Sequence, residues 1–153
     1  MSDLRRKMIE MNLDPEFLDF NFSVHTVEDA SRAAGVRVSD MTKNLVLLDD
    51  TNQLVIAALS ATDRLDIDRV GSLLGRRVRM AKASEVLKLV GYEAGAVPVV
   101  GFEGTLVLDT SVAQKPYLFS SAGTSRSLAR IPTKKLIEAT RPLVADIAAR
   151  KPE

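Results

Sequence analysis

The stretch NLVLLDDTNQLVIAAL, residues 44–59, does most to decide the fold of this chain. Its two apolar runs, residues 44–48 and 54–59, flank the polar segment DDTN at residues 49–52. Polar residues of these types between two apolar runs are typical of a turn, so the stretch predicts a β-hairpin. Because both runs are almost continuously apolar, we expect both faces of the hairpin to be buried.

Helical and strand patterns alternate on either side of this hairpin, which predicts one mixed α/β domain over residues 1–153. We expect Thr26 and Ser84 to cap helices, and Leu143 and Ile147 to share a face of a last helical segment. The expected helices cover residues 3–12, 26–35, 66–74, 84–90 and 132–140, and three of them end at Gly35, Gly75 and Gly91. The other expected strands cover residues 20–25, 77–80, 106–108, 117–120 and 128–131.

The composition excludes several classes of site. The chain has no cysteine and a single histidine, His25, which rules out disulfides, thiolate zinc sites, a cysteine nucleophile and a multi-histidine metal site. We therefore expect no metal and no cofactor. Residues 1–12 lack the apolar core of a signal peptide, and no run approaches the roughly 20 apolar residues of a membrane span. These features fit a cytoplasmic protein.

The charge balance argues against nucleic-acid binding through bulk positive charge, because the formal net charge is only +1. Contacts with nucleic acid would have to come from local basic clusters. Two such clusters occur, and both are more simply interpreted as solvated faces. They comprise Arg5, Arg6 and Lys7, and Arg76, Arg77, Arg79 and Lys82.

Lys43 lies immediately before the first apolar run of the hairpin. An ammonium group at the mouth of a buried strand can bind a phosphate or ribose oxygen, or stabilise developing negative charge. The alternative is a lysine at a strand end whose stem packs on apolar surface while its charge stays in water. Spacing alone favours this second interpretation.

The segment GYEAGAVPVVG, residues 91–101, is the least ordinary part of the chain. Glycines allow a backbone to approach a ligand closely, and exposed N–H groups in such a loop can hold a carbonyl oxygen or an oxyanion. The spacing of a Walker phosphate loop is missing, and a tight structural turn remains the equal alternative. His25 could act as a general base, although a structural role is simpler, and no Gly-x-Ser-x-Gly elbow supports a serine hydrolase.

The order of several short motifs resembles that of the YbaK/ProX family, which includes the editing insertion domain of bacterial prolyl-tRNA synthetase. The resemblance covers nearly the whole chain and extends to the tail at residues 145–150. Each motif is short, but their order and spacing together are specific. The motifs are Val24-His25-Thr26, Thr42-Lys43-Asn44-Leu45, Arg64-Leu65-Asp66, Gly91-Tyr92, Gly95-Ala96-Val97 and Ser121-Ala122-Gly123.

The resemblance implies a mixed, barrel-like β-sheet flanked by helices, and a free-standing hydrolase that deacylates misacylated tRNA, of the tRNA-Pro type. Its partner would be the 3′-terminal adenosine of an aminoacyl-tRNA, with an aminoacyl-tRNA synthetase as a further candidate. The attacking water would be helped by the ribose hydroxyl of the substrate. The resemblance gives catalytic roles to Lys43 and Gly101, and substrate-binding roles to His25, Thr42, Gly95, Ala96, Val97, Pro98, Ser121 and Gly123.

The chain departs from the family pattern at three positions. Ala96 replaces a glycine, Val99 occupies the expected proline position with Pro98 one residue earlier, and Ala129 replaces an acidic residue of the last strand. Two other functions therefore stay open: a non-catalytic module that binds the tRNA 3′ end or a nucleotide, and an accessory subunit of a synthetase.

Overall fold

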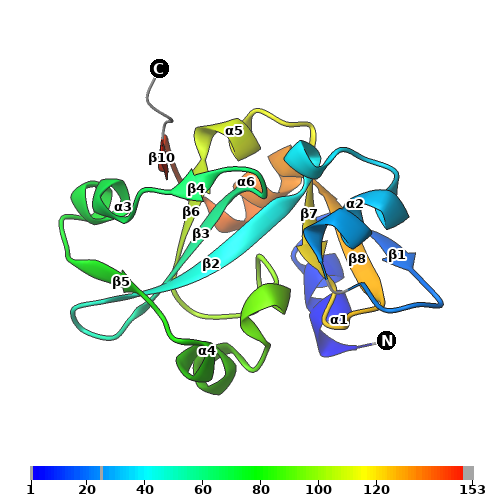
Figure 1. The fold of residues 1–153 in the computed structure, drawn as a ribbon, viewed down its shortest axis with the longest axis horizontal. Coiled ribbons are helices and arrows are strands. Elements are labelled where there is room, and N and C mark those ends of the chain that lie inside the picture. Colours follow the sequence, from blue (N-terminus) through cyan, green and yellow to red (C-terminus); the bar gives the residue numbers. More distant parts are fainter. Residues whose placement is uncertain (1, 25, 150–153) are drawn as a thin grey trace.

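The predicted hairpin forms the centre of the main sheet in the computed structural model, which describes residues 2–24 and 26–149. Strands β2 (Thr42–Asp49) and β3 (Leu54–Ser60) pair antiparallel, with Lys43 opposite Leu59 and Leu48 opposite Leu54. The sheet has five strands in the order β5-β2-β3-β6-β9 (Figure 1). Its outer members are β5 (Val78–Met80), which is antiparallel to β2, and the parallel strands β6 (Thr105–Asp109) and β9 (Leu143–Ala145).

Two smaller sheets complete the strand structure of the described residues. The three-stranded sheet has the order β1-β8-β7, and all of its neighbours are antiparallel. In Figure 1 it lies to the right of the five-stranded sheet, with α1 and α2 beside it. Its strands are β1 (Glu16–Asp19), β7 (Tyr117–Ser121) and β8 (Ser127–Pro132), and the third sheet pairs β4 (Arg64–Leu65) with β10 (Ala148–Ala149).

The expected barrel-like closure of the sheet is wrong for the described part of the chain, although the mixed α/β class is confirmed. The five-stranded sheet ends on β5 and β9, and neither edge pairs with the three-stranded sheet. Strand β5 pairs only with Leu47–Asp49 of β2, so the first half of β2 carries no partner strand on that side. An open edge at this place prevents closure into a barrel.

Six α-helices occur in the described residues, and their ends follow ordinary capping chemistry. Thr26 caps α2 as expected, because its Oγ1 accepts a hydrogen bond from the Asp29 amide at 3.0 Å. Gly35, Gly75 and Gly91 end α2, α3 and α4 in the left-handed conformation. The helices are α1 (Asp3–Glu10), α2 (Val27–Ala34), α3 (Ile67–Leu74), α4 (Ala83–Val90), α5 (Thr110–Ala113) and α6 (Thr133–Thr140), and the 3₁₀ turns are η1 (Val38–Asp40) and η2 (Ala94–Ala96). None of these helices is long and apolar enough to cross a membrane.

The strand expected over residues 20–25 is wrong, because the strand in this region is β1 at Glu16–Asp19. The regular pairing with β8 ends where Asp19 lies opposite Ser127. Beyond it the Phe20 amide donates to the Arg126 carbonyl at 2.8 Å and the Val24 amide to the Ser125 carbonyl at 2.6 Å, and these separate bonds do not continue the strand. Phe20 and Phe22 instead stack on each other, with ring centroids 5.5 Å apart. His25, at the end of the expected strand, lies outside the described residues.

Ser84 does not cap α4, which begins one residue earlier than expected. The Glu85 carboxylate instead accepts a hydrogen bond from the Lys82 amide at 2.9 Å and two from the Arg79 guanidinium at 2.8 and 2.9 Å. These bonds lower the pKa of Glu85 to about 2, and the hydrogen bonds from Arg79 contribute most to the shift. The carboxylate of Glu85 therefore caps the start of α4, the role that was expected of the Ser84 hydroxyl.

The helical segment expected around Leu143 and Ile147 is also wrong. Arg141 adopts a left-handed conformation with φ +47° and ends α6, after which the chain forms β9 and β10. Ile147 is fully buried between these strands, and its amide donates to Asp109 Oδ1 at 2.8 Å. Leu143 lies in β9 opposite Val107 and is exposed, so its i, i+4 spacing from the buried Ile147 does not indicate a helix.

Side chains alternate along β2 and divide it into two faces. Leu47 packs with Val70 of α3 on one face of the sheet. Val46 packs with Val97 of the glycine-containing loop and Leu136 of α6 on the other face. Because both faces carry buried residues, the expected double burial of the hairpin is confirmed.

Candidate functional site

The loop of residues 95–101, called here the 95–101 loop, is fastened to two strands by buried polar side chains. Asn44 of β2 donates from Nδ2 to the Val97 carbonyl at 3.0 Å. The Val99 amide donates to Ser120 Oγ of β7 at 3.1 Å. Because β2 and β7 belong to different sheets, the loop joins the two sheets at this place.

Gly101 and Gly123, two of the predicted site residues, lie on either side of one leucine. A Cβ atom added to Gly101 would be 3.4 Å from Leu4 Cδ1, and one added to Gly123 would be 3.4 Å from Leu4 Cδ2. Both glycines have φ angles that side chains rarely adopt, +107° and +100°. Leu4 of α1 therefore brings the 95–101 loop and the turn between β7 and β8 together.

The residues between these anchors differ in exposure. Val97 and Pro98 are buried, so their side chains fill the core and do not face solvent. Ala96 is half-buried, and its amide donates to the Glu93 carbonyl at 2.9 Å in the turn η2. Gly95 is exposed, its φ angle is not positive, and an added Cβ atom would meet nothing within 4 Å.

Lys43 is half-buried at the start of β2, and its ammonium donates to the backbone carbonyl of Asp63. Alternation along the strand places its side chain on the face opposite that of Asn44. The hydrogen bonds that join β2 to the 95–101 loop therefore come from Asn44, while the ammonium of Lys43 is turned to the segment after β3. Thr42, the preceding residue, is half-buried and lies opposite Ser60.

Ser121 lies at the end of β7, on the side of the loop where Gly123 follows. Its Oγ accepts a hydrogen bond from the Gly123 amide at 3.1 Å, which shapes the turn before β8. The predicted residues Gly101, Ser121 and Gly123 thus share one neighbourhood around Leu4. His25, another predicted substrate-binding residue, lies outside the described residues.

Four of the six N–H groups in the 95–101 loop, those of Gly95, Val97, Val100 and Gly101, are unused within the described part of the chain. The N–H groups of Val100 and Gly101 make no hydrogen bond to residues 2–24 or 26–149. They directly follow Val99, whose own amide is held by Ser120. Uncommitted N–H groups on a fixed backbone are the groups that can bind a carbonyl oxygen or an oxyanion.

One cavity adjoins the 95–101 loop, and a second lies beside the segment that Lys43 contacts. A cavity of about 240 Å³ borders the loop at Val99, Val100 and Gly101 and is lined further by Lys7 and Arg141. A larger cavity of about 890 Å³ is lined by Asp63, the residue that accepts the ammonium of Lys43.

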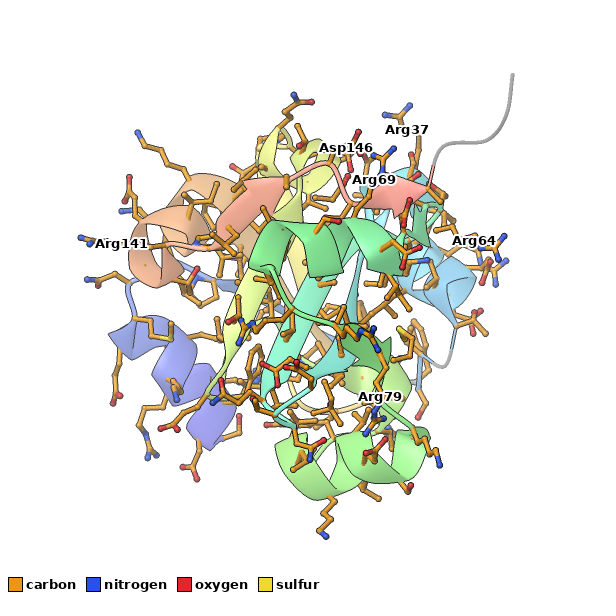
Figure 2. All side chains as sticks on the ribbon, turned by 90° about the vertical axis from the view of Figure 1, so that its left-hand side faces the viewer. Arg37, Arg64, Arg69, Arg79, Arg141 and Asp146 are labelled. Carbon is orange, nitrogen blue, oxygen red and sulfur yellow. The ribbon has the colours of Figure 1, made fainter. Side chains whose placement is uncertain are left out.

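The larger cavity also has charged walls. Arg64 lies at its edge, and Asp146 lies in its wall beside Arg69, with the carboxylate and guanidinium 3.0 Å apart (Figure 2).

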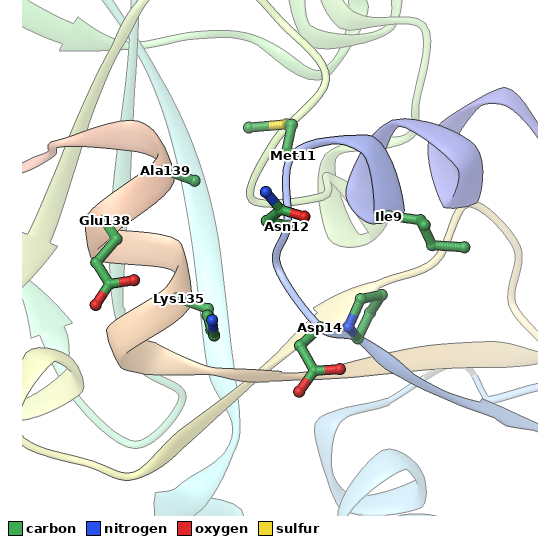
Figure 3. Close-up of a pocket in the computed structure, with 8 residues that line it drawn as sticks. Ile9, Met11, Asn12, Asp14, Lys135, Glu138 and Ala139 are labelled. Atoms are coloured by element: carbon green, nitrogen blue, oxygen red, sulfur yellow. The ribbon is translucent and has the colours of Figure 1, made fainter.

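A third cavity lies away from every predicted site residue. It occupies about 630 Å³ between the end of α1 and α6, where Asn12 and Asp14 face Lys135 (Figure 3). Among residues 2–24 and 26–149, no three histidine, aspartate or glutamate side chains gather as metal ligands could.

Sequence reasoning missed three residues that organise the site: Leu4, Asn44 and Ser120. Asn44 carried a usable signal, because it is a polar residue at the start of an apolar run that the hairpin buries. Leu4 and Ser120 carried none, since a leucine in an amphipathic helix and a serine in a strand are ordinary.

Comparison with known proteins gives this arrangement a context. Residues 22–139 match the model of the aminoacyl-tRNA editing domain family. The uncharacterised protein YwhH of Bacillus subtilis (strain 168) is 25% identical over 140 residues, which cover 90% of this chain and 89% of that protein. The structure resembles that of hypothetical protein APE2540, with a TM-score of 0.91, 28% identity, and coverage of 97% of this chain and 100% of that one. It also resembles a structure described as a proposed trans-editing enzyme for prolyl tRNA synthetase, with a TM-score of 0.84, 27% identity, and coverage of 98% and 99%.

Proposed function

Because the chain belongs to the aminoacyl-tRNA editing domain family, we propose that it is a trans-acting deacylase that hydrolyses the ester of a misacylated tRNA. The observation that carries this proposal is the assembly around Leu4. There, Gly101 of the fastened loop and Gly123 of the β7–β8 turn adjoin the same side chain. Loop residues with free N–H groups are thus held beside a second glycine turn and Ser121.

The reaction needs little from the protein beyond placement and charge stabilisation. Water attacks the ester carbonyl, the bond to the ribose oxygen breaks, and that oxygen leaves with a proton while the amino acid is released. Negative charge develops on the carbonyl oxygen in the transition state. The free N–H groups of Val100 and Gly101 are suited to receive it, and a ribose hydroxyl of the substrate would assist the water.

Lys43 would act on the tRNA rather than on the loop. Its ammonium lies at the segment that lines the cavity of about 890 Å³, where Arg64 adds a second positive charge. A phosphate or ribose oxygen of the terminal nucleotide could replace the Asp63 carbonyl as the acceptor of Lys43. In this arrangement Lys43 fixes the 3′ end, and the loop faces the ester from the other side of β2.

The departures from the family pattern bear on which amino acid is removed. Val99 is buried, and its amide is held by Ser120, so this position contributes backbone to the site and its side chain packs in the core. Ala96 is half-buried at the exposed end of the loop. A methyl group there changes the discrimination between small side chains by about 1–3 kcal/mol. A tRNA-Pro substrate is supported by the similarity to the structure described as acting with prolyl tRNA synthetase.

The decisive experiment measures amino acid release from a panel of mischarged tRNAs that includes proline, alanine and cysteine acceptor combinations. The wild-type chain should deacylate at least one member of the panel. Lys43→Ala should lower kcat/KM by roughly 100-fold, because a substrate end that is misplaced by about 1 Å costs on that scale. Lys88→Ala removes an exposed lysine of α4 and serves as the matched control. Activity of Lys43→Ala equal to that of the control would show that Lys43 takes no part.

One observation favours the binding-module alternative: the ammonium of Lys43 already has an acceptor, the carbonyl of Asp63. A lysine committed to the fold would leave the pocket able to hold a tRNA end without turnover. Salt-sensitive binding of tRNA together with no release from any charged tRNA would select this function over hydrolysis.

A further inference from the structure

Asn44 is a polar residue inside the most apolar part of the chain. The residue is only 8% exposed, and its side chain lies on the face of β2 that packs against the core. The amide reaches across 53 positions of sequence to the Val97 carbonyl. No other side-chain hydrogen bond among the described residues joins β2 to the 95–101 loop.

The chemistry of this contact fixes which way the amide is turned. A backbone carbonyl can only accept a hydrogen bond, so the nitrogen of Asn44 must face Val97. The oxygen of the same amide is then buried and accepts no hydrogen bond from the described residues. A buried acceptor without a partner is unfavourable, so a residue kept only for packing would be better as an apolar one. The benefit of Asn44 is therefore the link to the loop.

Ser120 supplies the matching link from the other sheet. It is 2% exposed, accepts from the Val99 amide at 3.1 Å, and donates its own proton to the Ser121 carbonyl at 2.9 Å. The donation directs the oxygen lone pairs of Ser120 toward Val99. Pro98, between the two fastened residues, has no N–H group and a restricted φ angle. Residues 97–99 are therefore held on both sides, and the free donors of Val100 and Gly101 follow at once.

We infer that Asn44 and Ser120 are positioning residues for deacylation. They act through the 95–101 loop and hold the N–H groups of Val100 and Gly101 where the carbonyl oxygen of the ester develops charge. Neither side chain touches the reacting atoms. This inference rests on the proposed function and extends it to two residues that lie outside the predicted site.

The test compares steady-state kinetics of Asn44→Leu and Ser120→Ala on the charged tRNA that the wild-type chain deacylates best. Each variant should lower kcat by roughly 10- to 100-fold, because a misplacement of about 1 Å costs on that scale. KM should change by less than about threefold, since the lost placement matters in the transition state rather than in binding. The matched control is Ser31→Ala, which removes a buried serine hydroxyl that donates to the Val36 carbonyl at 2.6 Å.

A double-mutant cycle separates loop positioning from general loosening. If both side chains act through the same loop, Asn44→Leu and Ser120→Ala should be non-additive, with the double variant little slower than the slower single variant. Asn44→Leu and Ser31→Ala share no partner, so their effects on kcat should simply combine. Additivity in the first cycle would overturn the inference.

Hydrogen exchange provides a readout that does not depend on turnover. In folded Ser120→Ala, the amide of Val99, which loses its acceptor, should exchange faster while those of β3 remain protected. If Asn44→Leu does not fold, Ser120→Ala alone decides. If the wild-type chain is active but Ser120→Ala changes neither the exchange of the loop nor kcat, the positioning role is refuted and the proposed function stands. Inactivity of the wild-type chain on every charged tRNA would instead overturn the proposed function, and this inference with it.

Discussion

Gly95 and Gly101 begin and end the same loop, but the structure predicts opposite outcomes for the same substitution. Gly101 has a φ angle of +107°, and an alanine there must keep that angle or distort the loop. A side chain held in such a sparsely populated region costs about 1–3 kcal/mol. The added methyl group would meet Leu4 Cδ1 at 3.4 Å, a flexible neighbour, so backbone strain is the main part of the cost. Gly95 has neither a positive φ angle nor an atom within 4 Å of an added Cβ.

Gly95→Ala should therefore be neutral or stabilise the chain by up to about 1 kcal/mol, because it restricts the unfolded state. Gly101→Ala should destabilise it by about 1–3 kcal/mol, which corresponds to a fall in Tm of roughly 2–4 °C per kcal/mol for a chain of this size. Urea unfolding followed by far-ultraviolet circular dichroism measures both free energies. The slope of each transition should match that of the wild type.

The two variants also separate stability from catalysis. Gly95→Ala places a methyl group in the open space beside the loop, so deacylation should fall without any loss of stability. Gly101→Ala should lose both, because the strain displaces the N–H group of Gly101 itself. Equal urea midpoints for the two variants would refute the claim that the backbone of Gly101 is committed.

Three further predictions follow from individual contacts. In an NMR titration, the Glu85 carboxyl should titrate at about pH 2, and Arg79→Ala should raise its pKa toward the ordinary value. Since the pKa is lowered by folding, the ion pair stabilises the chain above about pH 4 and is lost as the pH falls toward 2. Leu4→Ala should cost about 2–3 kcal/mol in thermal unfolding and also lower deacylation, because Leu4 packs against both glycine turns and holds them together. Asp109→Ala should cost about 1–3 kcal/mol by the same measurement, because it leaves the buried amide of Ile147 without an acceptor.

Local features of the sequence predicted local features of the fold. The β2–β3 hairpin and the Thr26 cap depend on residues only a few positions apart, and both are confirmed. Strand β1 and the tail strands β9 and β10 depend on partners far along the chain, and they were missed or taken for other elements. Periodicity could not find them, because a short strand is stabilised by its neighbour rather than by its own pattern.

Some parts of the candidate site could be predicted from the sequence, and others could not. The family resemblance supplied Gly101 and Gly123 as candidate residues, and both have φ angles that other residues avoid. The contact between Asn44 and Val97 could not be predicted, because nothing in either segment specifies the other. The roles of Lys43 and the 95–101 loop in catalysis stay predictions, which the charged-tRNA panel tests.

In the proposed function Lys43 and the 95–101 loop act on one substrate, and the geometry of β2 explains how they could do so without touching each other. Lys43 and Asn44 are neighbours in sequence, but alternation sends their side chains to opposite faces of the strand. The pairing of β5 with β2 covers only Leu47–Asp49, so no partner strand borders Lys43 or Asn44 on that side. A tRNA end laid across this open edge would have Lys43 on one face and the loop fastened by Asn44 on the other. A lysine on the same face as the loop would compete with Asn44 for the Val97 carbonyl and so disturb the bond that holds the loop. With the two side chains on opposite faces, the ammonium of Lys43 and the N–H groups of the loop do not interfere with each other.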